Sequence, residues 1–592
     1  MNASRIVRHV ALGTLLVASL LGEPAQPLAV ESASAQTPPG TVDVAPLPEG
    51  LDWLNTDRPL KLAEFRGKFV LLDFWTYCCI NCMHILPELK QLERAYPNNL
   101  VVIGVHSAKF ENEKDVENIR EALDRYEIEH PVVVDSELSV WQQFGARAWP
   151  TVILIDPRGK EILRYSGEIT AKQIAEVLDR ILPIYRRNRL LDERPVPFAQ
   201  PRREPTPLRF PGKVLADPAG RRLFIADSNH NRIVVVRADG TLVETIGSGR
   251  AGRADGDFDT AQFNKPQGMA IVDDVLFVAD TQNHLIRRVD LLRREVKTVA
   301  GTGEQLRELP AQFRTGKPLR TRLASPWALW PHEKHLYIAM AGPHQIWRMT
   351  LAGTSIGPYA GNGREDIVDG PLLPKQPFEP GYSSFAQPSG LASDGKWLFV
   401  ADSEGSSIRA VPLDGRGGVQ TLVGTARLPD ARLFTFGDVD GPPSQARLQH
   451  PLGVVFHRDR LYVADTYNNK IKQIDPKTGT VQTIAGDGAP GNTDSPRISG
   501  PHDGVNTPRP GGVSDDSAAS NPNTLARFNE PAGLTAAGGK LYVADTNNHL
   551  IRVIDLDQGN QVSTLAIPGL APPPKTAPQP KESRPKKGER GA

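Results

Sequence analysis

The chain has 592 residues, of which 39% are hydrophobic and 23% are charged, and its net charge is +1. This composition excludes a chain that is disordered over most of its length, and the balanced charge gives no electrostatic basis for binding nucleic acid or acidic membranes. The length predicts about two to four domains. Glycine and proline, with 52 residues each, are frequent enough to indicate a large region of strands and turns.

Residues 1–35 have the layout of a secretory signal peptide. Arg5 and Arg8 precede an apolar run at 10–22, and an Ala-Ser-Ala cleavage motif follows at 33–35. The apolar run is shorter than the roughly 20 residues that a membrane-spanning helix requires. We therefore expect an exported protein, periplasmic or secreted, whose mature chain has no integral membrane span. Retention of the segment as an N-terminal anchor is the alternative.

Residues 36–185 are expected to form an α/β domain, because short apolar strands alternate with segments of helical spacing. The expected strands cover 69–74, 101–105, 132–134 and 152–155, and the expected helices cover 84–96 and 115–126. A stretch rich in proline and arginine at 186–209 is interpreted as a linker. A basic, proline-rich tail at 569–592 is expected to be disordered.

Residues 210–568 repeat one strand pattern six times, as in LFVADTQNHLIRRV and LYVADTYNNKIKQI. Four short strands per copy predict a six-bladed β-propeller, so the fold class is multidomain, with an α/β domain followed by an all-β domain. Long segments lie between the fourth strand of one copy and the first strand of the next. Such insertions project from one face, which is the expected binding surface for protein partners. One position of the repeat is an aspartate in five copies and a methionine in the third: Asp227, Asp280, Met340, Asp402, Asp465 and Asp545.

The repeats resemble NHL repeats, and two copies carry the letters Asn-His-Leu, at 283–285 and 548–550. The resemblance implies that the repeated aspartates cap the turn into the next strand by accepting backbone hydrogen bonds. His230, His284 and His549 are interpreted as structural residues in equivalent turns. A metal site would need three or more convergent ligands, and no metal is expected.

All three cysteines lie within residues 78–82, where they cannot staple distant parts of the chain. Cys79 and Cys82 form a C-x-x-C motif between a strand and a helix, where the helix N-terminus stabilises a thiolate. Cys82, one turn later, lies within disulfide reach of Cys79. Haem attachment is excluded because Met83 follows Cys82, and structural zinc is excluded because no second cysteine pair exists. Dithiol redox chemistry is left as the leading hypothesis.

The segment LLDFWTYCCINC resembles the strand and active-site loop of thioredoxin-like proteins. The resemblance implies that Cys79 is the nucleophile, that Cys82 resolves the mixed disulfide, and that Asp73 is a buried acid that relays a proton. It also implies that Pro87 kinks the helix and that Pro150 follows a cis peptide bond and faces the dithiol.

Three features depart from the thioredoxin pattern or stay open. Cys78 stands where thioredoxins usually have tryptophan, either as a small buried residue or as a modulator or second resolving thiol. Trp149, beside Pro150, either lines a substrate groove or packs in the core. The segment at 106–115 is expected to be a solvated acidic turn near the site.

The combination of a thioredoxin-like domain, a Cys-Cys-Ile-Asn-Cys loop and NHL repeats resembles the NHL repeat-containing protein 2 family and its bacterial relatives. This resemblance supports the architecture more than the activity. With the export signal and the C-x-x-C motif, we expect an exported thiol–disulfide oxidoreductase whose propeller binds protein partners, with no cofactor and no nucleic acid. One alternative is a non-enzymatic interaction protein whose cysteine pair is structural. Another is a propeller-based, metal-dependent lyase or hydrolase.

Overall fold

Two domains make up the part of the chain that the computed structural model describes, which comprises residues 42–198, 204–428, 431–496 and 525–574. The expected signal peptide at 1–35 lies outside these ranges, as do residues 575–592 of the expected tail. No helix within them is both long and apolar enough to cross a membrane. The segment just after 568 is part of the fold, since Leu570 is buried and the Ala571 carbonyl accepts a hydrogen bond from Arg232.

The first domain is built on a mixed sheet of seven strands in the order β1-β7-β6-β3-β4-β5-β2. Central strand β3 runs parallel to β4 and antiparallel to β6, and every residue of it is buried, as expected for a strand covered on both faces. The strands are β1 (Val42–Asp43), β2 (Trp53–Leu54), β3 (Phe69–Trp75), β4 (Leu100–Ser107), β5 (Val132–Asp135), β6 (Thr151–Ile155) and β7 (Lys160–Ser166).

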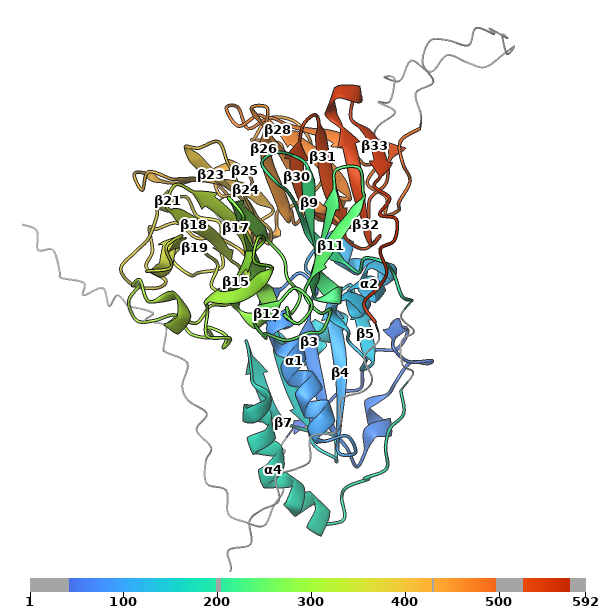
Figure 1. Ribbon diagram of the computed structural model, residues 1–592. Helices are drawn as coiled ribbons and strands as arrows, with labels where there is room; N and C mark the ends of the chain where they lie inside the picture. The colour runs from blue at the N-terminus through green and yellow to red at the C-terminus, as the bar shows by residue number, and fades with distance from the viewer. Residues whose placement is uncertain (1–41, 199–203, 429–430, 497–524, 575–592) are drawn as a thin grey trace, which may run out of the picture. The chain divides into compact units, whose positions relative to one another are not determined.

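Four helices cover this sheet: α1 (Ile80–Ala95), α2 (Val116–Tyr126), α3 (Ser139–Phe144) and α4 (Ala171–Arg187). Helices α1 and α4 lie side by side (Figure 1), and with α2 they bury one face of the sheet, whereas α3 packs on the other. Asp115 and Thr170 cap α2 and α4 through their side chains. Helix α1 contains Pro87 and begins at Ile80, earlier than the apolar spacing predicted.

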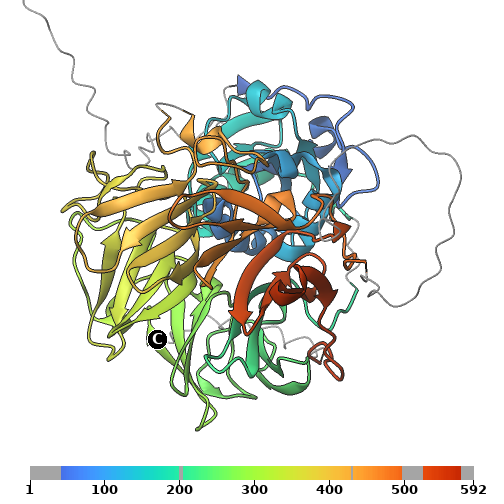
Figure 2. The ribbon, with the colours of Figure 1, turned by 90° about the horizontal axis from the view of Figure 1, so that it is seen from above.

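The second domain consists of six antiparallel sheets, each formed by consecutive strands, which confirms the six-bladed propeller. In Figure 2 the sheets follow one another around a common centre in chain order. Blade 1 consists of β8 (Pro211–Ala216), β9 (Arg222–Asp227), β10 (Arg232–Arg237) and β11 (Leu242–Ile246). Blade 2 consists of β13 (Met269–Val272), β14 (Val275–Asp280), β15 (Leu285–Asp290) and β16 (Glu295–Ala300), with β12 (Gly256–Asp257) at its edge. Blade 3 consists of β17 (Pro326–His332), β18 (His335–Met340), β19 (Gln345–Thr350) and β20 (Ile356–Ala360).

Blades 4 to 6 repeat this arrangement. Blade 4 consists of β22 (Pro388–Ser393), β23 (Trp397–Asp402), β24 (Ser407–Pro412) and β25 (Gly418–Val423), with β21 (Gly370–Pro371) at its edge. Blade 5 consists of β26 (Gly453–His457), β27 (Arg460–Asp465), β28 (Lys470–Ile474) and β29 (Val481–Ala485). Blade 6 consists of β30 (Pro531–Ala537), β31 (Lys540–Asp545), β32 (Leu550–Asp555) and β33 (Gln561–Thr564). Blades 1 and 6 are joined by side chains, because Thr535 Oγ1 accepts from the Ala216 N–H and Thr546 Oγ1 donates to the Pro211 carbonyl.

The repeated aspartates are fully buried and bind both backbone and cations. In blade 4 the Asp402 carboxylate accepts the Ala386 N–H at 2.8 Å and pairs with the buried Arg409 at 3.2 Å. The expected backbone hydrogen bond therefore exists, but it comes from the loop before the first strand of the blade. In blade 3, Met340 and Trp347 replace the pair by apolar packing. The other blades use Arg232, Arg287, Lys472 and Arg552 as the cation.

In the first strand of its blade, next to the propeller centre, Lys213 occupies a position that is glycine in most other blades. A Cβ atom on Gly453 would lie 2.2 Å from the Ala532 carbonyl oxygen, so the strands approach too closely for most side chains. Blade 1 has Lys213 at the equivalent position, and its ammonium group crosses the central channel to the Leu452 carbonyl in blade 5. Burial lowers the pKa of Lys213 to about 7.

Each blade is preceded by an X-Pro pair whose first residue has a left-handed backbone. We call these six residues the pre-proline ring: Phe210, Lys265, Ser325, Gln387, His450 and Glu530. The backbone N–H of each donates to a side chain of the preceding blade at 2.8 to 3.2 Å. The acceptors, in the same order, are His549, Asn231, His284, His344, Ser406 and Asn469.

These hydrogen bonds assign the histidines of the repeats. His284 and His549 hold the pre-proline ring, so their structural role is as expected. His230 lies in the equivalent turn, as expected, but at a different position of that turn. It lies one position earlier, in the place of Asn283, and its ring nitrogen contacts Asp227 at 2.9 Å.

Arg409→Met is expected to lower the free energy of unfolding by about 3–5 kcal/mol, because it leaves the Asp402 carboxylate buried without its cation. Urea unfolding followed by tryptophan fluorescence measures the loss. The matched control is Arg416→Met, an exposed position of the same blade, which should change stability by less than about 0.5 kcal/mol. Equal effects of both substitutions would contradict a stabilising role for the buried pairs.

Candidate dithiol site

The C-x-x-C motif lies where strand β3 leads into helix α1. Cys79 is the N-cap residue of α1 and is 5% exposed, whereas Cys82 is 0% exposed on the first turn. The Cys79 sulfur lies 3.9 Å from the Trp149 carbonyl oxygen. The Trp149–Pro150 peptide bond is cis, which confirms the expectation for Pro150 and places its loop against the nucleophile position. Both residues are therefore buried, and Cys79 is the less buried of the two.

Asp73 is a buried acid beside the helix that carries the dithiol. Neither of its carboxylate oxygens has a hydrogen-bond partner among the described residues. Burial raises the pKa of Asp73 to about 7, against a smaller opposing effect of His130. The pKa of Cys82 is raised well above its usual range, mainly by burial. A hydrogen bond with Cys79 and the charges of Cys79 and Asp73 act in the same direction. The two groups therefore have the environments of a proton acceptor and a proton donor.

A glycine on the neighbouring strand makes room for polar rings next to Asp73. Gly104 on β4 pairs with Asp73, and a Cβ atom there would lie 3.0 Å from Trp75 Nε1 and 3.5 Å from His130 Nε2. His130 Nδ1 lies 3.3 Å from the carboxylate of Glu93, which is partly exposed. His130 thus lies between the buried acid and a surface carboxylate.

Cys78 is fully buried, which agrees with the expectation of a small residue filling a core position. Its backbone N–H donates to Glu113 Oε1 at 2.9 Å, and its sulfur lies 4.0 Å from Thr76 Oγ1. Burial, together with the charges of Glu113 and Glu404, raises the pKa of Cys78 well above its usual range. Cys78 is therefore a protonated thiol at neutral pH, in contact with groups that lie behind the dithiol loop.

Trp149 both packs and borders the nucleophile. Its ring lies 4.3 Å from that of Trp141, its indole N–H donates to the Ser107 carbonyl at 2.9 Å, and the residue is partly buried. The Lys109 ammonium lies 6.0 Å from the Trp149 ring. The indole therefore fixes the Pro150 loop.

The expectation of a solvated turn at 106–115 holds only in part, because Glu111 and Asp115 are exposed whereas the propeller covers Lys109. Glu113 is buried, the Lys109 side chain is 6% exposed, and its ammonium group lies between Glu365 at 3.0 Å and Glu404 of the propeller. Burial raises the pKa of Glu404 to about 8. Burial acts in the same direction on Glu365, but the charges of Lys109 and His344 outweigh it and lower the pKa of Glu365 to about 2. The Lys109 ammonium therefore balances negative charge on this pair of carboxyl groups.

The pre-proline ring contacts the first domain directly. Ser325 Oγ lies 2.7 Å from His84 Nε2 on α1, and the Lys265 ammonium donates to the Arg125 carbonyl at 2.5 Å. The insertions between blades add further contacts, so the face expected to bind partners is covered in this structure by the chain's own first domain. These contacts join Gln305 to Glu168, Arg307 to Glu88 and Gln449 to the Glu111 N–H, and the ring residue Glu530 pairs with Arg125.

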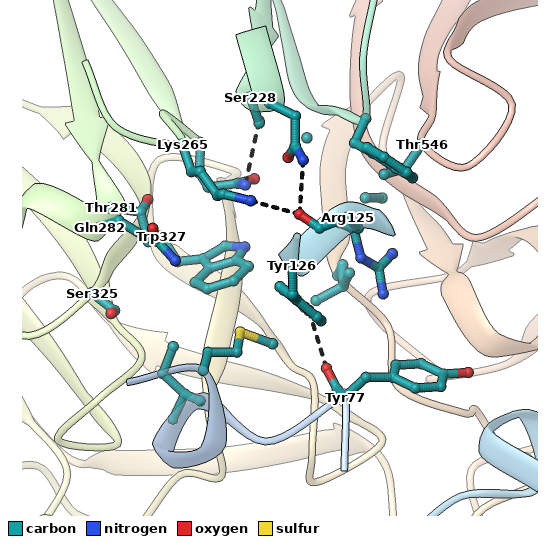
Figure 3. Close-up of a pocket in the computed structure, with 18 of the residues that line it drawn as sticks. Tyr77, Arg125, Tyr126, Ser228, Lys265, Thr281, Gln282, Ser325, Trp327 and Thr546 are labelled. Carbon is teal, nitrogen blue, oxygen red and sulfur yellow. Dashed lines mark hydrogen bonds between the residues drawn. The ribbon is translucent and has the colours of Figure 1, made fainter. Parts of the chain in front are cut away.

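A cavity of about 110 Å³ lies between the dithiol helix and the centre of the propeller. Ile80, Met83 and Tyr126 line it from the first domain, and Lys265 and Trp327 line it from the propeller. Figure 3 shows the hydrogen bonds that converge on the Arg125 carbonyl at its edge. The cavity reaches Ile80, which directly follows the nucleophile position.

The residues that the sequence did not single out come from the propeller and from 106–115: Gln387, Glu365, Glu404, Lys109 and Glu113. The sequence offered one signal for Gln387: the residue before the repeated proline is different in every copy, although the proline after it recurs. Within the described ranges, no three His, Cys, Asp or Glu side chains are grouped so that they could hold a metal ion.

Comparisons with known proteins match both domains. A thioredoxin-like family model matches residues 67–161, and an NHL repeat model matches residues 528–554. The chain is 41% identical over 559 residues to NHL repeat-containing protein 2 of Homo sapiens, covering 89% of this chain and 72% of that protein.

Two further relatives match different proportions of this chain. The chain is 41% identical over 548 residues to the protein SUPPRESSOR OF QUENCHING 1, chloroplastic, of Arabidopsis thaliana, covering 90% of this chain and 48% of that protein. The chain thus spans about half the length of the plant protein. It is 32% identical over 124 residues to the thiol-disulfide oxidoreductase ResA of Halalkalibacterium halodurans, covering 21% of this chain and 68% of that protein.

Asp73→Asn is expected to raise the free energy of unfolding at pH 8 but not at pH 4. The carboxyl has a pKa of about 7 in the fold against its usual 3.8. Between these values the unfolded chain has released a proton that the folded protein keeps, so stability falls as the pH rises through this window. Removing the carboxyl removes this loss, which corresponds to at most about 4 kcal/mol at pH 8.

Urea unfolding of the reduced protein at pH 4, 6 and 8 measures the effect. Asp57→Asn, at an exposed position, is the control and should change stability by less than about 0.5 kcal/mol at each pH. A gain from Asp73→Asn that is equal at all three pH values would show that ionisation of Asp73 does not cause it.

Proposed function

The chain belongs to the NHL repeat-containing protein 2 family, and on this premise we propose that it is a thiol–disulfide oxidoreductase that uses Cys79 and Cys82. The observation that carries the proposal is the pairing of the dithiol with a buried acid. Cys79 is 5% exposed at the helix N-terminus, and Cys82 is fully buried, close enough to Asp73 for that carboxyl to affect the pKa of its thiol. The thioredoxin-like match at 67–161 includes all of these residues.

In the first step the Cys79 thiolate attacks one sulfur of a substrate disulfide. A Cys79–substrate disulfide forms, the substrate S–S bond breaks, and the leaving sulfur departs as a thiolate that takes up a proton. The helix N-terminus favours the attacking thiolate because its backbone N–H groups carry partial positive charge. The Pro150 loop lies on the side from which the substrate approaches, since the Trp149 carbonyl borders the Cys79 sulfur.

In the second step Cys82 resolves the mixed disulfide. The Cys82 thiol gives its proton to the Asp73 carboxylate, and the resulting thiolate attacks the Cys79 sulfur. The Cys79–Cys82 disulfide forms and the second substrate sulfur leaves as a thiolate. Two electrons pass from the dithiol to the substrate, and the reverse sequence oxidises a substrate dithiol. The pKa of Asp73 near 7 suits proton exchange at neutral pH.

The propeller is proposed to bind protein partners, in keeping with its NHL-type blades. A second candidate function has one observation in its favour. Cys79 is only 5% exposed beside the propeller, as a purely structural pair in a non-enzymatic interaction protein would be. The reduction potential of the pair separates the two functions.

The protein is also proposed to be exported to the periplasm or outside the cell, with residues 1–35 as the signal peptide. The support is the order of arginines, apolar run and Ala-Ser-Ala motif. Mass spectrometry of the full-length gene product recovered from bacterial periplasm should give Gln36 as the first residue. A chain found only in the cytoplasm with residues 1–35 attached would contradict export.

Titration of the purified protein in dithiothreitol or glutathione buffers should give a Cys79–Cys82 reduction potential of roughly −120 to −270 mV, the range of catalytic dithiols. Trapping with a maleimide followed by mass spectrometry reports the oxidised fraction. A potential below about −300 mV would indicate a structural bridge and support the second candidate.

Single substitutions assign the thiols in the same assay. Cys79→Ser should abolish reduction of a model disulfide, and Cys82→Ser should accumulate the mixed disulfide on Cys79, because the resolving thiol is missing. Cys78→Ser is the matched control, since Cys78 is buried behind the loop, and it should keep the activity. A loss of activity in Cys78→Ser equal to that in Cys79→Ser would overturn the assignment.

A further inference from the structure

We propose that Gln387 of the propeller is a positioning residue for the dithiol and controls the reactivity of Cys79. This role deepens the proposed exchange reaction and rests on it. Gln387 belongs to the pre-proline ring and is 1% exposed. It lies more than 300 residues from the cysteines along the chain, yet its side chain binds the loop that carries them.

The Gln387 carboxamide makes two hydrogen bonds to the dithiol loop. Its Oε1 accepts the Ile80 N–H at 2.8 Å, and its Nε2 donates to the Cys78 carbonyl at 2.9 Å. The orientation of the amide is fixed, because a backbone N–H can only donate and a carbonyl can only accept. Cys79 lies between the two bonded residues, so its position is defined from both sides.

The first of these bonds completes the N-terminus of helix α1. The Ile80 N–H is the first of the four backbone donors that a helix leaves without an internal partner. Cys79 occupies the N-cap position, but its side chain makes no capping hydrogen bond. The propeller supplies an acceptor that the helix's own sequence lacks, and this acceptor lies at the N–H next to the nucleophile.

Gln387 is itself held rigidly. Its N–H donates to His344 Nδ1 at 3.1 Å, and its carbonyl accepts from the hydroxyls of Ser389 and Ser403 at 2.8 Å each. These bonds come from the propeller alone. The carboxamide therefore meets the dithiol loop as a fixed group and does not follow its movements.

The consequence for Cys79 is electrostatic as well as geometric. The carboxamide oxygen takes up an N–H at the helix end whose positive charge would otherwise favour a thiolate. Replacing Gln387 by an apolar side chain frees this N–H and releases the loop, and both changes favour a more reactive Cys79. A carboxylate at the same place keeps the acceptor, loses the donor to Cys78 and adds a negative charge, which disfavours the thiolate.

The test compares Gln387→Met, Gln387→Glu and Ser325→Ala in the reduced full-length protein. Ser325 is the matched control, because it belongs to the same ring and binds α1 through His84 without touching the dithiol loop. The rate of Cys79 alkylation by iodoacetamide is measured from pH 5 to 9 by mass spectrometry. We expect Gln387→Met to react at least threefold faster than wild type at pH 7, Gln387→Glu at least threefold slower, and Ser325→Ala within twofold.

If both Gln387 variants react at the wild-type rate, or both are accelerated equally, Gln387 only joins the domains and the inference is wrong. Alkylation does not require a substrate, so it is independent of the exchange assay. A wild-type potential below about −300 mV would refute the proposed function, and opposite shifts in the two variants would then still show that Gln387 controls the Cys79 thiol.

Discussion

Six backbone N–H groups, one before each repeated proline, determine how the propeller is closed and what its central face presents. Each belongs to a residue with a left-handed backbone, which costs an ordinary residue about 1 kcal/mol or more. A side chain of the preceding blade accepts the hydrogen bond and makes that conformation stable. The same bond links neighbouring blades, including the first and the last. Each of the six residues uses only its backbone N–H for this hydrogen bond, so its side chain can make a different contact.

The side chains of Lys265, Ser325, Gln387, His450 and Glu530 contact the thioredoxin-like domain, and this interface places unusual charge in the interior. Lys109 with Glu404 and the buried aspartate–cation pairs of the blades are taken out of water, where a lone charge would cost several kcal/mol, whereas Glu365 stays partly exposed. Blade 3 shows that the fold does not need such a pair, because Met340 and Trp347 fill the same space. Charge at the domain interface is more specific than apolar packing, since a shifted docking would leave Lys109 or a glutamate unpaired.

The sequence predicted those parts of the molecule that depend on local pattern. Alternating strands and helices, the repeat period and the proline before β6 were readable, as were Cys79, Cys82 and Asp73 as one site. Gln387 and Lys109 were not, because their roles arise from contacts across about 300 residues that no local periodicity records. Part of the segment at 106–115 was misjudged for the same reason: its polar residues predict a surface, but contacts with the propeller cover the side chain of Lys109.

The order of the domains along the chain has a consequence for biosynthesis. The sheet and helices around Cys79 form from one contiguous stretch that ends at Arg187, whereas Gln387 lies 200 residues further on. Domains tend to fold as units, beginning with the part that is made first. A newly made chain therefore passes through a stage in which the dithiol helix is folded but its partner in blade 4 is absent. The cysteines meet the surrounding redox buffer and folding helpers then, before the ring of blades closes beside them.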